Sequence, residues 1–70
     1  MTYEEAVRAA KEVASHRTVV YVENGTFYAA TYAAWRRSNI HPFALAWDSG
    51  ATPEANANLF DVATIWQEER

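Results

Sequence analysis

The fold is decided by the stretch TVVYVENGTFYAATYAAW, residues 18–35. Two runs of β-branched and aromatic residues flank Asn24-Gly25, a dipeptide that tolerates the positive φ angles of a type I′ turn. The sequence therefore predicts a β-hairpin with a two-residue turn. Counting outward from the turn gives the strand register, in which the pairs are Glu23 with Thr26, Val22 with Phe27, Tyr21 with Tyr28, Val20 with Ala29, and Val19 with Ala30.

Alternation along the two strands sorts their side chains onto two faces of the sheet. The face expected to join the core carries Val20, Val22, Phe27 and Ala29. The opposite face carries Val19, Tyr21, Tyr28, Ala30 and, if the strand continues, Tyr32. Core formation does not account for the tyrosines on this second face. They either pack beneath a helix and complete the core or form an exposed surface.

Residues 33–37, AAWRR, are compatible with two local structures. A continued second strand would place Ala33 and Trp35 on the core face, and we favour this interpretation. A short helix is the alternative, because alanine and arginine are good helix formers. The sequence does not decide between them.

Residues 43–47, FALAW, alternate large and small side chains and predict a third strand. Its pattern places Phe43, Leu45 and Trp47 on one side and only alanines on the other. The segment SNIHP, residues 38–42, is expected to form the turn that precedes this strand, and residues 48–50, DSG, are expected to end it.

Helices are predicted at both ends of the chain. Thr2 and Glu5 match a capping box, which begins a helix expected to reach about Ser15. Its apolar positions are Tyr3, Ala6, Val7, Ala10, Val13 and Ala14. Thr52 and Pro53 mark the start of a second helix that continues nearly to the C-terminus. Its apolar positions cover a wider arc than one packed face requires, so one edge is expected to be exposed. They are Leu59, Phe60, Val62, Ala63, Ile65 and Trp66.

These elements predict one α+β domain over residues 1–70, in the order α-β-β-β-α, with a three-stranded antiparallel sheet flanked by an N-terminal and a C-terminal helix. The absence of cysteine excludes disulfides and thiolate metal sites. Six basic and nine acidic residues give a formal charge of −3, which argues against a generic phosphate or nucleic-acid binder. No targeting segment or membrane span is recognised, so a soluble, cytoplasmic protein is expected.

No constellation of residues indicates catalysis. His16 and His41 are the only histidines, and nearby serines and Asp48 invite a triad interpretation, but no nucleophile elbow or oxyanion loop accompanies them. Neither histidine has a second ligand at metal-binding spacing, and both glycines belong to turns. The sequence therefore predicts no catalytic residue, no metal and no cofactor, and a protein that is not an enzyme.

The predicted interaction site combines the tyrosine face of the hairpin with nearby charged residues. Tyrosine, tryptophan and arginine are enriched at protein–protein hot spots, whereas acids at the rim steer association. The candidate protein-binding residues are Tyr21, Glu23, Tyr28, Tyr32 and Arg36. Two alternatives stay open: single-stranded nucleic-acid binding through Tyr28, Tyr32 and Arg36, and a small homodimer that pairs through a strand edge or the aromatic face.

In size and organisation the whole chain resembles the small phage-encoded anti-CRISPR proteins, which are compact, cysteine-free, mildly acidic α+β domains without enzymatic motifs. The resemblance carries over no functional residue. It implies a stoichiometric inhibitor, acting in the cytoplasm of a host bacterium, that docks on a larger protein complex. That complex would be a CRISPR effector, in which the inhibitor blocks target-DNA binding or nuclease recruitment.

Overall fold

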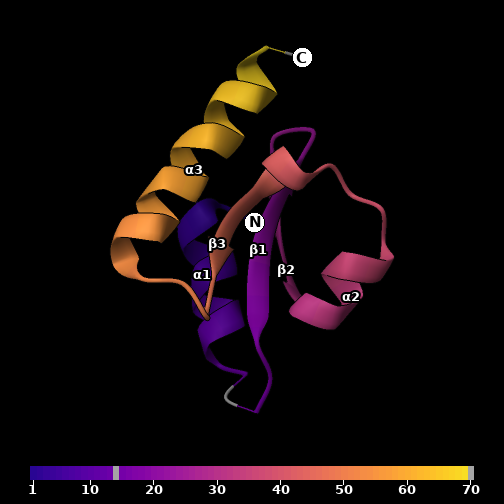
Figure 1. The fold of residues 1–70 in the computed structure, drawn as a ribbon, viewed down its shortest axis with the longest axis vertical. Helices are drawn as coiled ribbons and strands as arrows, with labels where there is room; N and C mark the ends of the chain where they lie inside the picture. Colours follow the sequence, from indigo (N-terminus) through magenta and orange to yellow (C-terminus); the bar gives the residue numbers. More distant parts are fainter. Residues whose placement is uncertain (14, 70) are drawn as a thin grey trace.

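The computed structural model describes residues 1–13 and 15–69 and has the predicted α+β architecture. Its elements in chain order are α1 (Tyr3–Lys11), β1 (Thr18–Glu23), β2 (Thr26–Thr31), α2 (Tyr32–Arg37), the 3-10 helix η1 (Pro42–Ala44), β3 (Leu45–Asp48) and α3 (Pro53–Glu68). The three strands form one antiparallel sheet in the order β2-β1-β3. Helices α1 and α3 lie on one side of this sheet and α2 lies on the other (Figure 1).

The hairpin has the predicted turn and register. Asn24 and Gly25 adopt φ angles of 52° and 79°, as a type I′ turn requires. Every predicted pair from Glu23–Thr26 to Val19–Ala30 is present between β1 and β2. The hairpin turn is also tied to the far end of the chain, because the Gly25 N–H donates to Oε1 of Gln67 in α3 at 3.0 Å.

Both terminal helices begin where the sequence predicts. Thr2 caps α1 through a complete capping box with Glu5, and the Thr52 hydroxyl oxygen caps α3 by accepting from the Ala55 N–H at 3.2 Å. Helix α1 ends at Lys11, earlier than the predicted Ser15. The chain turns away there to enter β1, and its Thr18 hydroxyl donates to the Ala10 carbonyl in the last turn of α1. Val13 is 43% exposed, and Ala14 lies outside the described residues.

The core lies between α1, α3 and the predicted core face of the hairpin. Val20 and Val22 of β1 pack there against small residues of both helices, and Phe27 of β2 joins them at the margin. The buried members of this cluster are Ala6, Ala10, Val20, Val22, Ala46, Trp47 and Ala63. Alanines let the helices approach the sheet closely, and the aromatic rings of Tyr3, Phe27 and Phe60 close one side of the cluster. Among the described residues, no helix is both long and apolar enough to cross a membrane.

The preference for a continued second strand at residues 33–37 is wrong, because this segment forms α2. The Thr31 hydroxyl caps the helix by accepting from the Ala34 N–H at 3.2 Å, and the Tyr32 N–H donates to the Arg17 carbonyl at 2.8 Å. These two hydrogen bonds turn the chain out of the sheet. As a result Ala33 is exposed, and Trp35 packs on the face opposite the core.

The third strand exists, but it begins at Leu45 and not at Phe43. Pro42 is the first residue of η1, and Nδ1 of His41 accepts from the Phe43 N–H at 3.1 Å. A bulge then places Leu45 opposite Tyr21 and Trp47 opposite Val20, on different faces of the sheet. The predicted common face of Phe43, Leu45 and Trp47 is therefore wrong: Phe43 is 55% exposed, whereas Ala44 and Ala46 are fully buried.

Candidate protein-binding face of the sheet

The sheet face opposite the core carries a contiguous set of aromatic rings, which we call the aromatic face: Tyr21, Tyr28 and Trp35. The Tyr21 and Tyr28 rings stack across the hairpin with centroids 5.4 Å apart, and Tyr21 also contacts Trp35 at 5.5 Å. Tyr28 is 41% exposed, whereas Tyr21 and Trp35 are half-buried. The aromatic face therefore consists of two half-buried rings and one exposed ring, that of Tyr28.

Its geometry follows from the hairpin and from α2. The type I′ turn places Tyr21 directly opposite Tyr28, so their rings meet without any adjustment of the backbone. Helix α2 returns over this face and sets Trp35 against Tyr21. Beneath them Val19 is completely buried. The face is therefore covered in part, by the short α2 and not by either terminal helix.

Arg17 holds α2 in place. Its guanidinium makes two hydrogen bonds to the Asp48 carboxylate, from Nε to Oδ1 at 2.9 Å and from Nη2 to Oδ2 at 2.5 Å. Arg17 Cζ also lies 4.0 Å from the centroid of the Tyr32 ring, and Arg36 Cζ lies 5.8 Å from the same ring. Tyr32 is therefore engaged in a clamp that joins the start of β1, the end of β3 and the start of α2.

The electrostatics of this region follow from the same contacts. The hydrogen bonds from Arg17 hold the pKa of the Asp48 carboxyl below its usual value, and the pair raises the pKa of the Arg17 guanidinium. Burial raises the pKa of the Tyr21 hydroxyl, with smaller contributions from Glu23 and Tyr28. The Tyr21 hydroxyl therefore stays protonated and able to donate at neutral pH.

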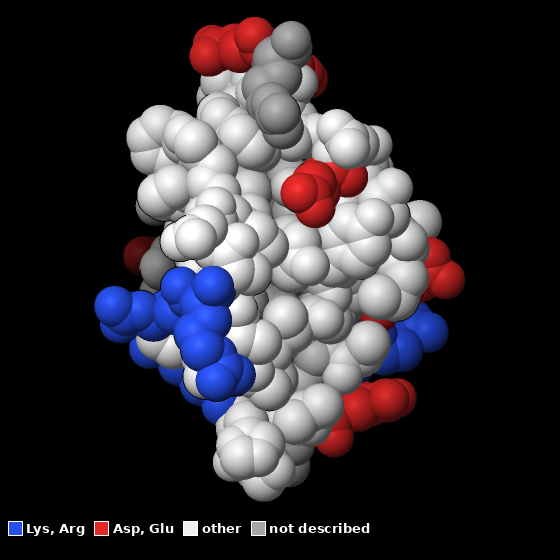
Figure 2. Space-filling view, turned by 90° about the vertical axis from the view of Figure 1, so that its right-hand side faces the viewer, with Lys and Arg blue, Asp and Glu red and all other residues white. Residues whose placement is uncertain are grey.

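The charge around the aromatic face is uneven. Helix α2 has no acid in its first turn and carries Arg36 and Arg37, both exposed, in its last turn. Figure 2 views the molecule from the α2 side and shows a broad uncharged surface with a large basic group at its lower left, and with acidic residues at the top, within its upper part and along the right border. This side of the molecule thus combines a large uncharged area with charges of both signs.

The structure brings the predicted site residues together as two pairs. Tyr21 and Tyr28 form the stacked pair on the sheet, whereas Tyr32 and Arg36 form a second pair on α2. Glu23 is exposed at the end of β1, beside the hairpin turn. Sequence reasoning missed Trp35 and Arg17. Reading residues 32–37 as a helix would have moved Trp35 off the core face, but no local signal indicates that Arg17 contacts Tyr32.

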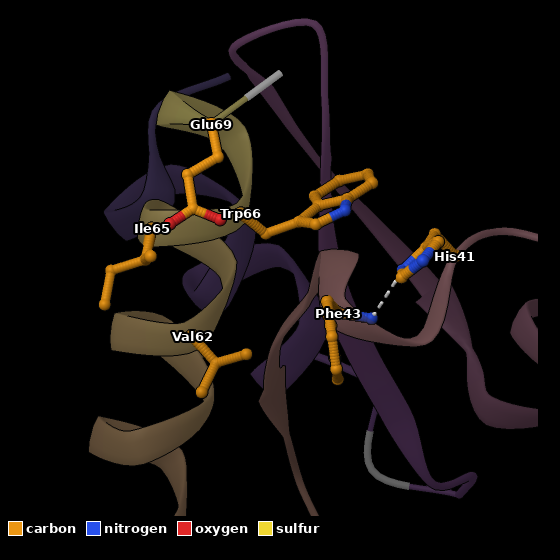
Figure 3. Close-up of a pocket in the computed structure, with 6 residues that line it drawn as sticks. All are labelled: His41, Phe43, Val62, Ile65, Trp66 and Glu69. Atoms are coloured by element: carbon orange, nitrogen blue, oxygen red, sulfur yellow. Dashed lines mark hydrogen bonds between the residues drawn. The ribbon is translucent and has the colours of Figure 1, made fainter.

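A second exposed surface lies between α3 and η1, away from α2 (Figure 1). We call it the α3–η1 groove; it has a volume of about 330 Å³ and is lined by His41, Phe43, Val62, Ile65, Trp66 and Glu69 (Figure 3). The His41 ring stacks on Trp66 with centroids 4.9 Å apart. Val62 and Ile65 are 44% and 54% exposed. The sequence predicts this exposed edge of α3, but it misses the contribution of Phe43.

Two of the polar residues weighed for a catalytic triad, Asp48 and Ser38, are engaged in other contacts. Asp48 accepts from Arg17 and from the Gly50 N–H, and the Ser38 hydroxyl donates to the Trp35 carbonyl. Within residues 1–13 and 15–69, no group of three or more histidine, cysteine, aspartate or glutamate side chains is placed to hold a metal ion. No family model, curated protein or solved structure matches this chain.

Proposed function

We propose that this protein is a non-enzymatic binding protein that docks on a larger protein through the aromatic face. The observation that carries the proposal is the exposed Tyr28 ring, stacked on the half-buried Tyr21 and followed along the face by Trp35. Aromatic rings with a polar tip bury a large area at a low cost in conformational entropy, and they recur as interface anchors.

The strands and the helix that carry these rings are held in place, which is a second argument for the proposal. Tyr21 and Tyr28 stand on paired strands, and α2 is clamped through Arg17 and Tyr32, so the surface is ordered before a partner arrives. A preordered surface binds more tightly because fewer side chains lose freedom on association. Arg36 and Arg37 at one margin favour a partner whose matching margin is acidic.

We further propose that the partner is a CRISPR effector complex and that the protein inhibits it by one-to-one docking. This part of the proposal rests on the resemblance to phage-encoded anti-CRISPR proteins in size and composition. Under it the protein acts in the bacterial cytoplasm and has no enzymatic turnover. Inhibition would then rise linearly with added protein until the effector is saturated.

The test is affinity capture from bacterial lysate, with and without nuclease, by the wild type and a Tyr28→Ala/Arg36→Ala double variant. Lys11→Ala/Val13→Ala is the matched control, because both residues are exposed and belong to neither the aromatic face nor the α3–η1 groove. We expect the wild type and the control to retain a nuclease-resistant complex that the double variant loses. Equal recovery by the double variant would remove the aromatic face from the proposal.

The CRISPR target is tested separately with purified effector complexes of several types. Saturable one-to-one binding that abolishes cleavage of target DNA supports it. If no effector binds while the capture experiment still identifies another protein, the target is wrong and the binding role stands.

Single-stranded nucleic acid is a second candidate ligand, favoured by one observation. The structure places Arg17 and Arg36 on the ring of Tyr32, in the same helix as Trp35. Stacked bases bind to such combinations of rings and cations. Binding of an oligothymidine that weakens steeply with salt supports this candidate, and absent or salt-independent binding contradicts it.

A further inference from the structure

The α3–η1 groove belongs to neither the aromatic face nor the core, and three of the large apolar side chains that line it are exposed. Phe43, Val62 and Ile65 are 55%, 44% and 54% exposed along its length. In Figure 3 they lie side by side, and the Glu69 side chain extends back along α3 toward Ile65. An apolar strip of this kind on a small domain marks a contact surface.

The charge on this side of the molecule indicates the chemistry of the occupant. Residues 53–69, which comprise α3 and the residue that caps it, contain four acids and no lysine or arginine. They are Glu54, Asp61, Glu68 and Glu69. Glu69 itself lines the groove. The occupant therefore combines an apolar surface with basic residues.

Helix α2 of the same protein has this chemistry. It exposes Ala33 and Ala34 beside Arg36 and Arg37, and it contains no acid. It lies on the side of the sheet opposite α3 (Figure 1). Within one molecule, α2 and the groove therefore face in different directions, and only a second copy can bring them together.

We infer that the α3–η1 groove receives α2 of a second copy of this chain. The small side chains of Ala33 and Ala34 let α2 approach Phe43, Val62 and Ile65. Arg36 and Arg37 then reach Glu68 and Glu69 at the C-terminal end of α3, where a cation is favoured by the helix dipole as well.

Charge also decides between this arrangement and a symmetric dimer through two grooves. A groove-to-groove dimer would bring together Asp61, Glu68 and Glu69 of both copies, and like charges at an interface oppose association. The contact of α2 with the groove is heterologous, because each copy binds one neighbour through its α2 and another neighbour through its groove. Such contacts propagate into a ring or an open chain of molecules.

The inference goes beyond the proposed binding function and does not depend on it. It concerns purified protein alone, whereas the capture experiment concerns a partner. Because Trp35 of the aromatic face also belongs to α2, association between copies would compete with docking of a partner there.

The first test is sedimentation velocity over a range of concentrations at low and high salt. We expect the wild type to associate as concentration rises, and less so at high salt. Arg36→Glu/Arg37→Glu and Val62→Ser/Ile65→Ser are each expected to weaken association about tenfold or more. Arg8→Glu/Lys11→Glu is the matched control for net charge, since it makes the same change on α1, and it should associate as the wild type does.

The decisive test mixes the α2 variant with the groove variant. Each has lost one surface and keeps the other, so together they should form a discrete one-to-one dimer that cannot grow. This dimer also shows that both variants are folded. A wild type that stays monomeric at the highest concentration at low salt overturns the inference. So does a mixture that fails to dimerise although the wild type associates, because this result indicates a symmetric contact.

Discussion

Alternate residues of the same hairpin point to the two faces of the sheet, yet helices cover the two faces to different extents. On one face, α1 and the 16-residue α3 bury Val20 and Val22. On the other, the six-residue α2 covers Val19 but leaves Tyr28 41% exposed. The difference lies in the length of the covering helices, and it separates a covered face from one that stays partly exposed.

The largest loss in the free energy of unfolding is expected for a substitution on the core face. Trp47→Ala removes the largest side chain of the core cluster, which is only 9% exposed. It should lower the free energy of unfolding by about 3–5 kcal/mol, because the cavity cannot close fully. Urea denaturation measures this as a lower midpoint at unchanged slope. A smaller loss than that caused by Trp35→Ala would reverse the assignment of the two faces.

Asp48→Ala tests the clamp that joins β3 to α2. It removes the acceptor for both Arg17 and the Gly50 N–H. We expect a loss of about 1–3 kcal/mol in the free energy of unfolding. Asp48→Asn is the control, since it keeps the shape and one oxygen acceptor, and it should lose less. An unchanged denaturation midpoint for Asp48→Ala would show that α2 is held by its other contacts.

The clamp also predicts a pH dependence. Arg17 holds the pKa of Asp48 lower in the folded protein than in the unfolded chain. The stabilisation from Asp48 is therefore present above the unfolded value of about 3.9 and is lost as the pH falls below it toward the folded value. The wild type should lose its stability advantage over Asp48→Asn in this acidic range. A constant difference between the two proteins from pH 7 to the acidic limit would contradict the assigned pKa shift.

Trp35→Ala should have a smaller effect than Trp47→Ala, although the same side chain is removed. Trp35 is half-buried and its ring contacts Tyr21, so we expect its removal to lower the free energy of unfolding by about 1–2 kcal/mol. The measurement is the same urea titration. A loss equal to that of Trp47→Ala would indicate a second core on this side of the sheet.

Tyr28→Ala is expected to have the smallest effect on folding. It removes one cross-strand pair on an exposed surface, which changes the free energy of unfolding by less than about 1 kcal/mol. Its effect on capture of a partner should be much larger than its effect on the denaturation midpoint. If capture of the partner falls only as far as the lower stability explains, Tyr28 contributes to capture through stability alone.

Local signals in the sequence predicted much of the fold. Asn24-Gly25 determines the hairpin and its register, and Thr2 and Thr52 determine the helix starts, because each signal involves residues that are near neighbours in the chain. The stacking of Tyr21 on Tyr28 follows from the register alone. This half of the aromatic face was therefore predictable.

The remaining features depend on contacts between distant residues. Helix α2 forms where Tyr32 meets the carbonyl and guanidinium of Arg17, and no pattern within residues 33–37 reports that contact. The bulge that separates Leu45 from Trp47 arises from pairing with β1. The first error placed Trp35 on the core face, and the second placed Phe43 on a common strand face with Leu45 and Trp47, so each hid part of an exposed surface.

The hydrogen bond from the Gly25 N–H to Gln67 makes one amide a reporter of the last turns of α3. Its donor lies in the hairpin turn and its acceptor lies 42 residues away, near the end of α3. Amide hydrogen exchange at Gly25 should therefore accelerate whenever the last turns of α3 detach, even while the hairpin stays formed. Occupation of the α3–η1 groove would slow that exchange, so a single resolved signal would follow docking at a surface that Gly25 does not line.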